Sequence, residues 1–129
     1  MIVGVPKEIF PAERRVALIP ASIPALKKAG CSVLVESMAG YLAGYTDAAY
    51  EARGATIAGS RDAVFAEAHA IFQLVGVGAN QATGRQDLKH FRKGQVAVGF
   101  QRALGNPEAL QELGQTGATV FAIEMMPRI

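Results

Sequence analysis

Charged residues gather directly after the first apolar segment of the chain. The stretch reads PKEIFPAERRVALIP and contains Lys7, Glu8, Glu13, Arg14 and Arg15. An arginine held at the end of a strand can grip a carboxylate or a phosphate with two parallel hydrogen bonds. Arg15 is the better candidate of the two arginines, because it adjoins an apolar segment whose packing would fix its direction. The alternative is a solvated run of charges without a ligand.

A second candidate lies near the other end, where the apolar segment 119–125 runs into Pro127 and Arg128. Proline cannot continue an interior strand, so the chain must leave the sheet here. Ligands of α/β proteins bind beyond the carboxyl ends of the strands. We therefore predict a buried strand over 119–125 and a binding role for Arg128, with a plain surface arginine as the alternative.

Other patterns argue against several kinds of site. The stretch GVGAN does not continue into the full Gly-x-Gly-x-x-Gly pattern of a dinucleotide-binding loop. His69 and His90 have no neighbouring cysteine or acidic cluster, so we expect no metal site. We expect His69 at an edge or in the core and His90 on the surface. No serine lies in a Gly-x-Ser-x-Gly turn, so we expect no hydrolytic triad.

Composition narrows the class of protein further. A length of 129 residues with 50% hydrophobic and 19% charged residues fits one folded domain and excludes a disordered chain. The net charge of +2, spread along the chain, does not favour nucleic-acid binding. The single cysteine, Cys31, cannot form an internal disulfide; we expect it in the core of a cytosolic protein. No apolar run approaches the ~20 residues that span a bilayer, and the N-terminus does not resemble a signal peptide.

Apolar runs alternate with helix-like segments and supply the framework for these candidates. We expect strands over residues 2–6, 32–37, 55–59, 69–75, 95–100 and 119–125, a short helix over 87–91, and helices capped at Ser22, at Thr46 or Asp47, at Ser60 and at Asn106. Unbroken apolar strands joined by crossover helices imply a parallel sheet covered on both faces. We predict a doubly wound, mostly parallel α/β domain of five or six strands, flavodoxin-like or Rossmann-like in type.

Several stretches together resemble the N-terminal domain of the alanine dehydrogenase and proton-translocating nicotinamide nucleotide transhydrogenase family. VGVPKEIFPAERRVALIPASIPALKKAG is similar to the opening of that family. VLVESMAGYLAGYTDAAYEARGA is similar to its next strand, glycine-rich turn and helix, and FAIEMMPRI to the strand that leads into a Pro-Arg-Ile loop. The order and spacing of these stretches cover nearly the whole chain.

Within that family, the resemblance favours the transhydrogenase alpha subunit, or its first part in split versions. Alanine dehydrogenases have a lysine where this chain has Gln73, and a catalytic histidine in a loop where residues 101–106 have none. Without these groups, oxidative deamination lacks its carboxylate grip and its proton transfer. An NAD-dependent dehydrogenase of alanine or another amino acid, and a non-catalytic structural or dimerisation domain, remain as alternatives.

The resemblance implies a reaction in which a hydride passes from NADH to NADP⁺ while protons move through a membrane component. It implies NAD(H) in the full-length protein, NADP(H) on a partner subunit, no metal, and no catalytic side chain in this domain, since the chemistry needs positioning. We assign cofactor-binding roles to Arg128, Arg15 and Gln73.

The resemblance also implies an assembly and a longer chain. We expect a homodimer that docks on membrane and NADP-binding subunits, cytoplasmic and peripheral at the inner membrane. In this family an NAD-binding Rossmann domain follows the N-terminal domain. We therefore expect residues 1–129 to be a truncated N-terminal α/β domain that is inactive alone.

Overall fold

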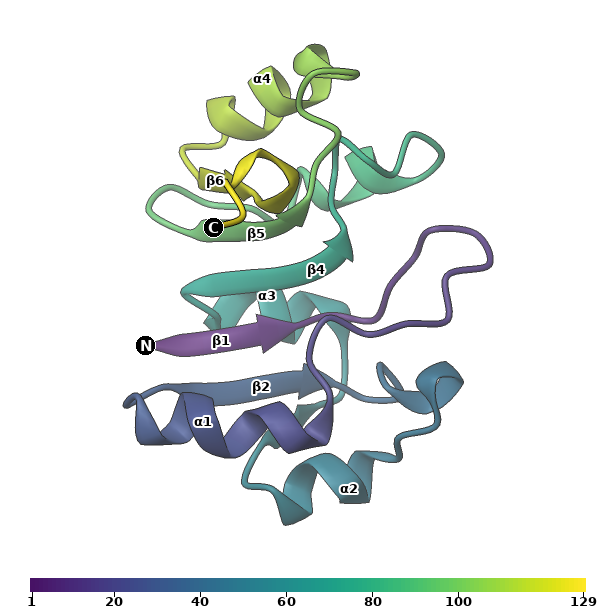
Figure 1. Cartoon of the computed structure of the whole chain (residues 1–129), viewed down its shortest axis with the longest axis vertical. Coiled ribbons are helices and arrows are strands. Elements are labelled where there is room, and N and C mark those ends of the chain that lie inside the picture. The colour runs from purple at the N-terminus through teal and green to yellow at the C-terminus, as the bar shows by residue number, and fades with distance from the viewer.

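Each of the six apolar runs forms a strand, and five of the six have nearly the predicted bounds. The computed structural model describes residues 1–129 (Figure 1). The strands are β1 (Ile2–Val5), β2 (Ser32–Glu36), β3 (Thr56–Ala58), β4 (Ala70–Val75), β5 (Val96–Phe100) and β6 (Thr119–Ala122).

Four short α-helices and four 3₁₀ turns connect these strands. They are α1 (Ile23–Lys28), α2 (Asp47–Ala52), α3 (Arg61–Glu67) and α4 (Pro107–Gln115), with η1 (Pro20–Ser22), η2 (Tyr41–Ala43), η3 (Gly84–Asp87) and η4 (Ile123–Met125). Two predicted caps are confirmed, because Thr46 and Ser60 accept the N–H groups of Ala49 and Ala63. The side chains of Ser22 and Asn106 make no cap hydrogen bond. The longest helix has nine residues, and none is long and apolar enough to cross a membrane.

The six strands run parallel in the order β3-β2-β1-β4-β5-β6, which confirms the doubly wound fold. The chain builds one half of the sheet outward from β1, then returns to β4 and builds the other half. The order of the strands therefore reverses between β1 and β4. In folds of this kind the reversal opens a crevice at the carboxyl edge, where ligands bind.

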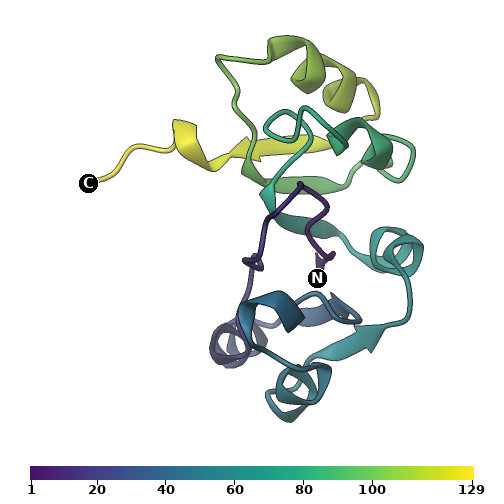
Figure 2. The ribbon, with the colours of Figure 1, turned by 90° about the vertical axis from the view of Figure 1, so that its right-hand side faces the viewer.

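Helices cover both faces of the sheet, as the views in Figures 1 and 2 show. One buried cluster joins Val5, Val33 and Val35 of the sheet to Ile23 of α1 and Tyr50 of α2. A second cluster packs α3 and α4 on the opposite face; its members include Val64, Phe65, Ile71, Ala97 and Leu113. The two clusters fix the strands, and with them the loops of the carboxyl edge.

The strand predicted over 119–125 is present, but its predicted end and its predicted burial were wrong. β6 ends at Ala122, the 3₁₀ turn η4 follows, and the Phe121 residue is 46% exposed. β6 is the edge strand, and the layer of α1 and α2 does not extend over it (Figure 1). Apolar composition alone did not distinguish this edge strand from a central one.

Three smaller expectations also need correction. The short helix predicted over 87–91 is replaced by η3, which ends at Asp87, because the Asp87 side chain turns inward to pair with an arginine. Cys31 is half-buried at the entry to β2 and does not lie in the core. His69 lies at the amino edge and accepts the N–H of Ile2, as predicted, whereas His90 is largely buried against Phe65.

Candidate functional site

The carboxyl edge splits where β1 and β4 separate. These two strands pair only at Val3 with Ala70 and at Gly4 with Ile71. Beyond that point the carboxylate of Glu8 accepts the backbone N–H groups of Leu74 (2.6 Å) and Val75 (3.2 Å). A side chain thus replaces the missing ladder bonds at the point of reversal.

Glu8 is a buried acid, with only 9% of the residue exposed. Burial raises the pKa of its carboxyl above 4.5, while the two backbone N–H bonds oppose that rise. The carboxylate has few routes to solvent and is held by β4. We therefore regard it as a structural group of the crevice and not as a ligand for an external cation.

The backbone of Lys7 is held at both of its polar groups. Its N–H donates to Oε2 of Glu36, the last residue of β2, at 2.7 Å. Its carbonyl accepts from Nη1 of Arg61, the first residue of α3, at 2.6 Å. The turn after β1 is consequently anchored to a neighbouring strand and to the helix beneath the sheet.

A buried cluster of polar side chains supports this turn. Arg61 donates from Nε and Nη2 to both oxygens of Asp87, each at 2.7 Å, and the Asp87 residue is only 2% exposed. Gln73 donates from Nε2 to the same carboxylate at 3.0 Å. Burial alone would lower the pKa of Arg61, but the hydrogen bonds and charge of Asp87 raise it, so the guanidinium stays charged. The guanidinium also lies 5.5 Å from the centre of the Phe65 ring.

Arg15 lies on the exposed loop after β1. Its side chain is 68% exposed and donates from Nε and Nη2 to Glu13, at 2.8 and 2.9 Å. The hydrogen bond from Arg15 lowers the pKa of Glu13 to about 2. Lys7, Glu8, Glu13, Arg14, Arg15, Ala39 and Leu42 line a small pocket here.

The three predicted cofactor-binding residues lie in different parts of the structure. Gln73 lies in the buried cluster, and Arg15 lies on the loop after β1. Arg128 is exposed in the segment after η4, which runs away from the body of the domain in Figure 2. None of the three pairs forms a hydrogen bond, so their shared role stays a prediction.

The loops after β4 and β5 are packed against each other. Gly78 donates its N–H to Oε1 of the buried Gln101, and its carbonyl accepts from Nδ2 of Asn106 at 3.0 Å. Asn80 is buried and exchanges two hydrogen bonds with Thr83. The stretch GVGAN is therefore a packed turn, in agreement with its incomplete glycine pattern.

Glu124 fastens the loop after β5 to the end of β6. Its carboxylate accepts the N–H groups of Gln101 and Ala103, the latter at 2.9 Å. Arg102 between them has the left-handed backbone angle φ of 53°. Partial desolvation would raise the pKa of Glu124, but the backbone hydrogen bonds outweigh it and the pKa is lowered.

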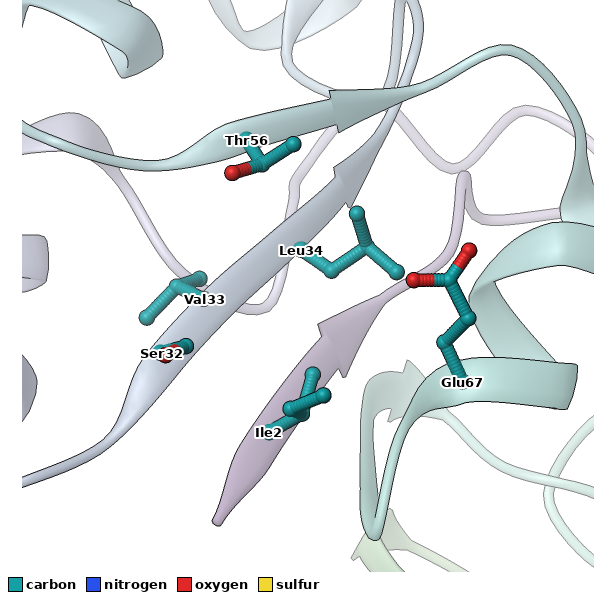
Figure 3. Close-up of a pocket in the computed structure, with 6 residues that line it drawn as sticks. All are labelled: Ile2, Ser32, Val33, Leu34, Thr56 and Glu67. Carbon is teal, nitrogen blue, oxygen red and sulfur yellow. The ribbon is translucent and has the colours of Figure 1, made fainter.

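The larger hollow of the molecule lies elsewhere. A pocket of about 100 Å³ opens between α3 and the first residues of β1, β2 and β3, at the amino edge (Figure 3). Its lining contains the hydroxyls of Ser32 and Thr56 and one carboxylate, Glu67. No group of three or more metal-ligating side chains occurs in the structure. The charged residues converge at the carboxyl edge, so we place the candidate site there.

Sequence reasoning missed the groups that build this edge. Glu8 was noted only as part of a charge run, and Glu36, Arg61, Asp87 and Glu124 were not singled out. The one available signal was the place of Glu36 and Glu8 at strand ends. Arg61 follows a capping serine and precedes Asp62, a pattern typical of an ordinary exposed helix start.

Comparison with known sequences gives a consistent result. The chain matches the family model "Alanine dehydrogenase/PNT, N-terminal domain" over residues 4–129. It is 36% identical over 129 residues to NAD(P) transhydrogenase subunit alpha of Cereibacter sphaeroides, covering 100% of this chain and 24% of that protein. It is also 36% identical over 124 residues to alanine dehydrogenase of Bacillus subtilis, covering 96% of this chain and 31% of that protein.

Solved structures agree with the sequence matches. A transhydrogenase from Sinorhizobium meliloti superimposes with a TM-score of 0.85 at 33% identity, covering 100% of this chain and 36% of that one. An L-alanine dehydrogenase gives a TM-score of 0.82 at 28% identity, covering 95% and 32%. The chain thus spans 24–36% of the length of these four relatives.

Proposed function

The chain belongs to the alanine dehydrogenase/PNT N-terminal domain family, and from this premise we propose that it is the N-terminal part of the NAD(H)-binding alpha subunit of a proton-translocating NAD(P) transhydrogenase. In this proposal the complete protein passes a hydride from NADH to NADP⁺. The domain forms one wall of the cleft that holds the nicotinamide.

The observation that carries the proposal is the lack of a lysine at position 73 and of a histidine in the loop 101–106 at the carboxyl edge. Gln73 is a neutral amide and is bound to Asp87. The loop 101–106 contains no histidine; His69 accepts the N–H of Ile2 at the amino edge, and His90 lies against the ring of Phe65, with Nδ1 3.6 Å from Asp62. Oxidative deamination needs a proton-transfer group, whereas hydride transfer between two nicotinamides needs only positioning.

The charges of the edge fit a nicotinamide nucleotide, which carries a negative pyrophosphate and a polar carboxamide. Lys7 and Arg14 form no ion pair, and Arg15 is paired only with Glu13 of the same loop. When bound, NAD(H) supplies the hydride chemistry. In our assignment Arg15 and Arg128 bind and orient the nucleotide. Gln73 contributes indirectly, through its hydrogen bond to Asp87.

We also propose an assembly for the complete protein, on the basis of its membership of the family. Relatives of this chain are named as the alpha subunit of a transhydrogenase, which supports association with further subunits. We propose a homodimer on the cytoplasmic side of the inner membrane, docked on subunits that bind NADP(H) and conduct protons. The membrane contact would then come from those partners.

One assay of the full-length protein tests the proposal. Single-turnover hydride transfer from NADH to an NADP⁺ analogue is compared with NADH oxidation by pyruvate and ammonium. We expect transfer to the analogue and no dependence on pyruvate. NADH oxidation that requires pyruvate and ammonium would overturn the transhydrogenase assignment in favour of an amino-acid dehydrogenase. Absence of both reactions in a folded protein would favour the structural domain.

A further inference from the structure

We propose that Arg61 is a positioning residue that fixes the Lys7–Glu8 turn and, through it, the arginine-bearing loop of the candidate site. The loop 6–19 has no helix or strand before η1 at Pro20–Ser22. Its geometry must therefore come from side chains that reach it from other elements. The proposal rests on the proposed function for one point, the assignment of this loop to ligand binding.

Arg61 joins three separate parts of the chain. Nη1 binds the carbonyl of Lys7 after β1, and Nε and Nη2 bind Asp87 at the end of η3. Nη1 also lies 3.5 Å from Oε2 of Glu36, which holds the N–H of Lys7. Glu36 thus binds the N–H of Lys7 and Arg61 binds its carbonyl, and these two side chains form an ion pair with each other.

The charge of Arg61 is needed as well as its shape. Glu8, Glu36 and Asp87 bring three carboxylates to this turn, and Arg61 is the cation among them. Removing the cation of a buried ion pair leaves the carboxylates buried without a counter-charge. The resulting loss of stability is larger than the net stabilisation that the ion pair provides. The planar fork makes two bonds to Asp87 and leaves a third nitrogen for Lys7, a set that a lysine ammonium cannot reproduce in the same geometry.

The anchored turn transmits its position to Arg15. After Lys7 and Glu8, the next residue is tied by its carbonyl, because Thr83 donates its hydroxyl to Ile9 at 3.1 Å. Glu13 then accepts both the backbone N–H and Nε of Arg15. Loosening the turn at Lys7 is therefore expected to widen the range of positions open to the guanidinium of Arg15.

The test compares Arg61→Lys and Arg61→Met with Arg85→Lys. Arg85 is a matched control, because it also makes two bonds to one carboxylate, Glu112 at 2.9 and 3.1 Å, but on the exposed surface. Hydrogen exchange is measured on peptides covering residues 1–15 and 70–80 of the full-length protein. NADH affinity is measured on the same samples, at a temperature where each variant is shown by its melt to be folded.

We expect Arg61→Lys to speed exchange in both peptides by about tenfold, the effect of losing a charged hydrogen bond, and Arg61→Met to speed it more. The dissociation constant of NADH should rise in the same order. Arg85→Lys should leave both measurements unchanged. Slower exchange and tighter NADH binding in Arg61→Lys than in Arg61→Met would show that the positive charge helps to position the turn.

The remaining outcomes separate this inference from the proposed function. Unchanged exchange in Arg61→Lys and Arg61→Met would overturn the positioning role, even if the wild-type protein binds NADH. Faster exchange with an unchanged NADH affinity would also overturn it, because the turn would then not matter for the ligand. If the wild-type protein does not bind NADH, the proposed function fails, and the exchange data alone decide whether Arg61 fixes the turn.

Discussion

The carboxylate of Glu8 lies 2.6 Å from the backbone nitrogen of Leu74, at the point where β1 and β4 stop pairing. A second bond, from the N–H of Val75, satisfies the next backbone donor of β4. Buried donors of this kind are costly when they lose their acceptor. The carboxylate of Glu8 therefore closes the sheet at the same place where the fold opens its crevice.

Replacing Glu8 by glutamine should destabilise the domain by about 1–3 kcal/mol, because the amide offers one acceptor where two donors must be met. Urea unfolding of the wild type and of Glu8→Gln measures the change. Glu67→Gln, at an exposed position on α3, is the control and should change stability by less than about 0.5 kcal/mol. Equal stability of all three proteins would show that the Leu74 and Val75 donors find water instead.

Two glutamates should give opposite pH dependences of stability. The pKa of Glu124 is lowered by backbone N–H groups, so its contribution is complete above about pH 4.5 and is lost as the pH falls. The pKa of Glu8 is raised by burial, so Glu8 binds a proton more readily in the folded state. Its contribution is complete well below pH 4.5 and declines as the pH rises from there through the folded pKa.

Denaturant unfolding between pH 3 and pH 7 checks both signs. Relative to the wild type, Glu124→Gln should lose less stability on acidification. The stability of Glu8→Gln should instead fall less than that of the wild type as the pH rises from 3 to 7. A parallel shift of both curves at every pH would contradict the assignment of the two pKa changes to these carboxyls.

Local patterns predicted much of this fold correctly. Thr46 and Ser60 cap helices as their spacing indicated, and five strands lie within one or two residues of their expected bounds. The missed parts depend on residues far apart in the chain. The pair Arg61–Asp87 spans 26 residues, and neither residue has a neighbour that marks it as buried.

The failure over β6 has a related cause. The residues from 119 to 125 have the composition of a core strand, but only the strand order shows that β6 lies at an edge. The charged stretch from Lys7 to Arg15 was expected at the carboxyl edge because it follows the first strand, and it lies on the loop after β1; its binding role stays a prediction. The side chains that hold its loop come from β2, α3 and the segment after β4, which sequence spacing does not place.

Gly78→Ala should destabilise the domain by about 1–3 kcal/mol, the usual cost of inserting a group into a filled space. A Cβ at this position would collide with the backbone carbonyl oxygen of Gln101, which cannot swing away. Gly114→Ala is the control with the opposite sign. It lies in α4 with nothing near its Cβ, and alanine there should stabilise the helix by about 0.5–1 kcal/mol. Thermal melts of both variants are sufficient, and a neutral Gly78→Ala would refute the close packing of the two loops.

Tyr50→Phe should lower stability by about 1–2 kcal/mol, because it leaves the carbonyl of Leu18 without its partner. The Tyr50 hydroxyl donates to that carbonyl at 2.7 Å, and burial raises the pKa of this phenol to about 12, so it remains a donor at neutral pH. Tyr45→Phe is the control, since no hydrogen bond of the Tyr45 hydroxyl is present. If the two variants unfold at the same urea concentration, the bond to Leu18 contributes nothing to stability.

In the full-length protein, Arg128→Ala should weaken NADH binding or slow hydride transfer by about ten- to a hundredfold, the effect of one charge-assisted hydrogen bond. Arg128 is exposed and forms no ion pair within the domain, so its removal should leave the thermal melt unchanged. Arg128→Lys should recover only part of the loss, because lysine keeps the charge but not the planar fork. Arg53→Ala, an exposed arginine at the end of α2, is the control and should match the wild type in every measurement. The measurements are the NADH dissociation constant and the single-turnover rate. Wild-type values for Arg128→Ala would make Arg128 a surface residue and remove it from the site.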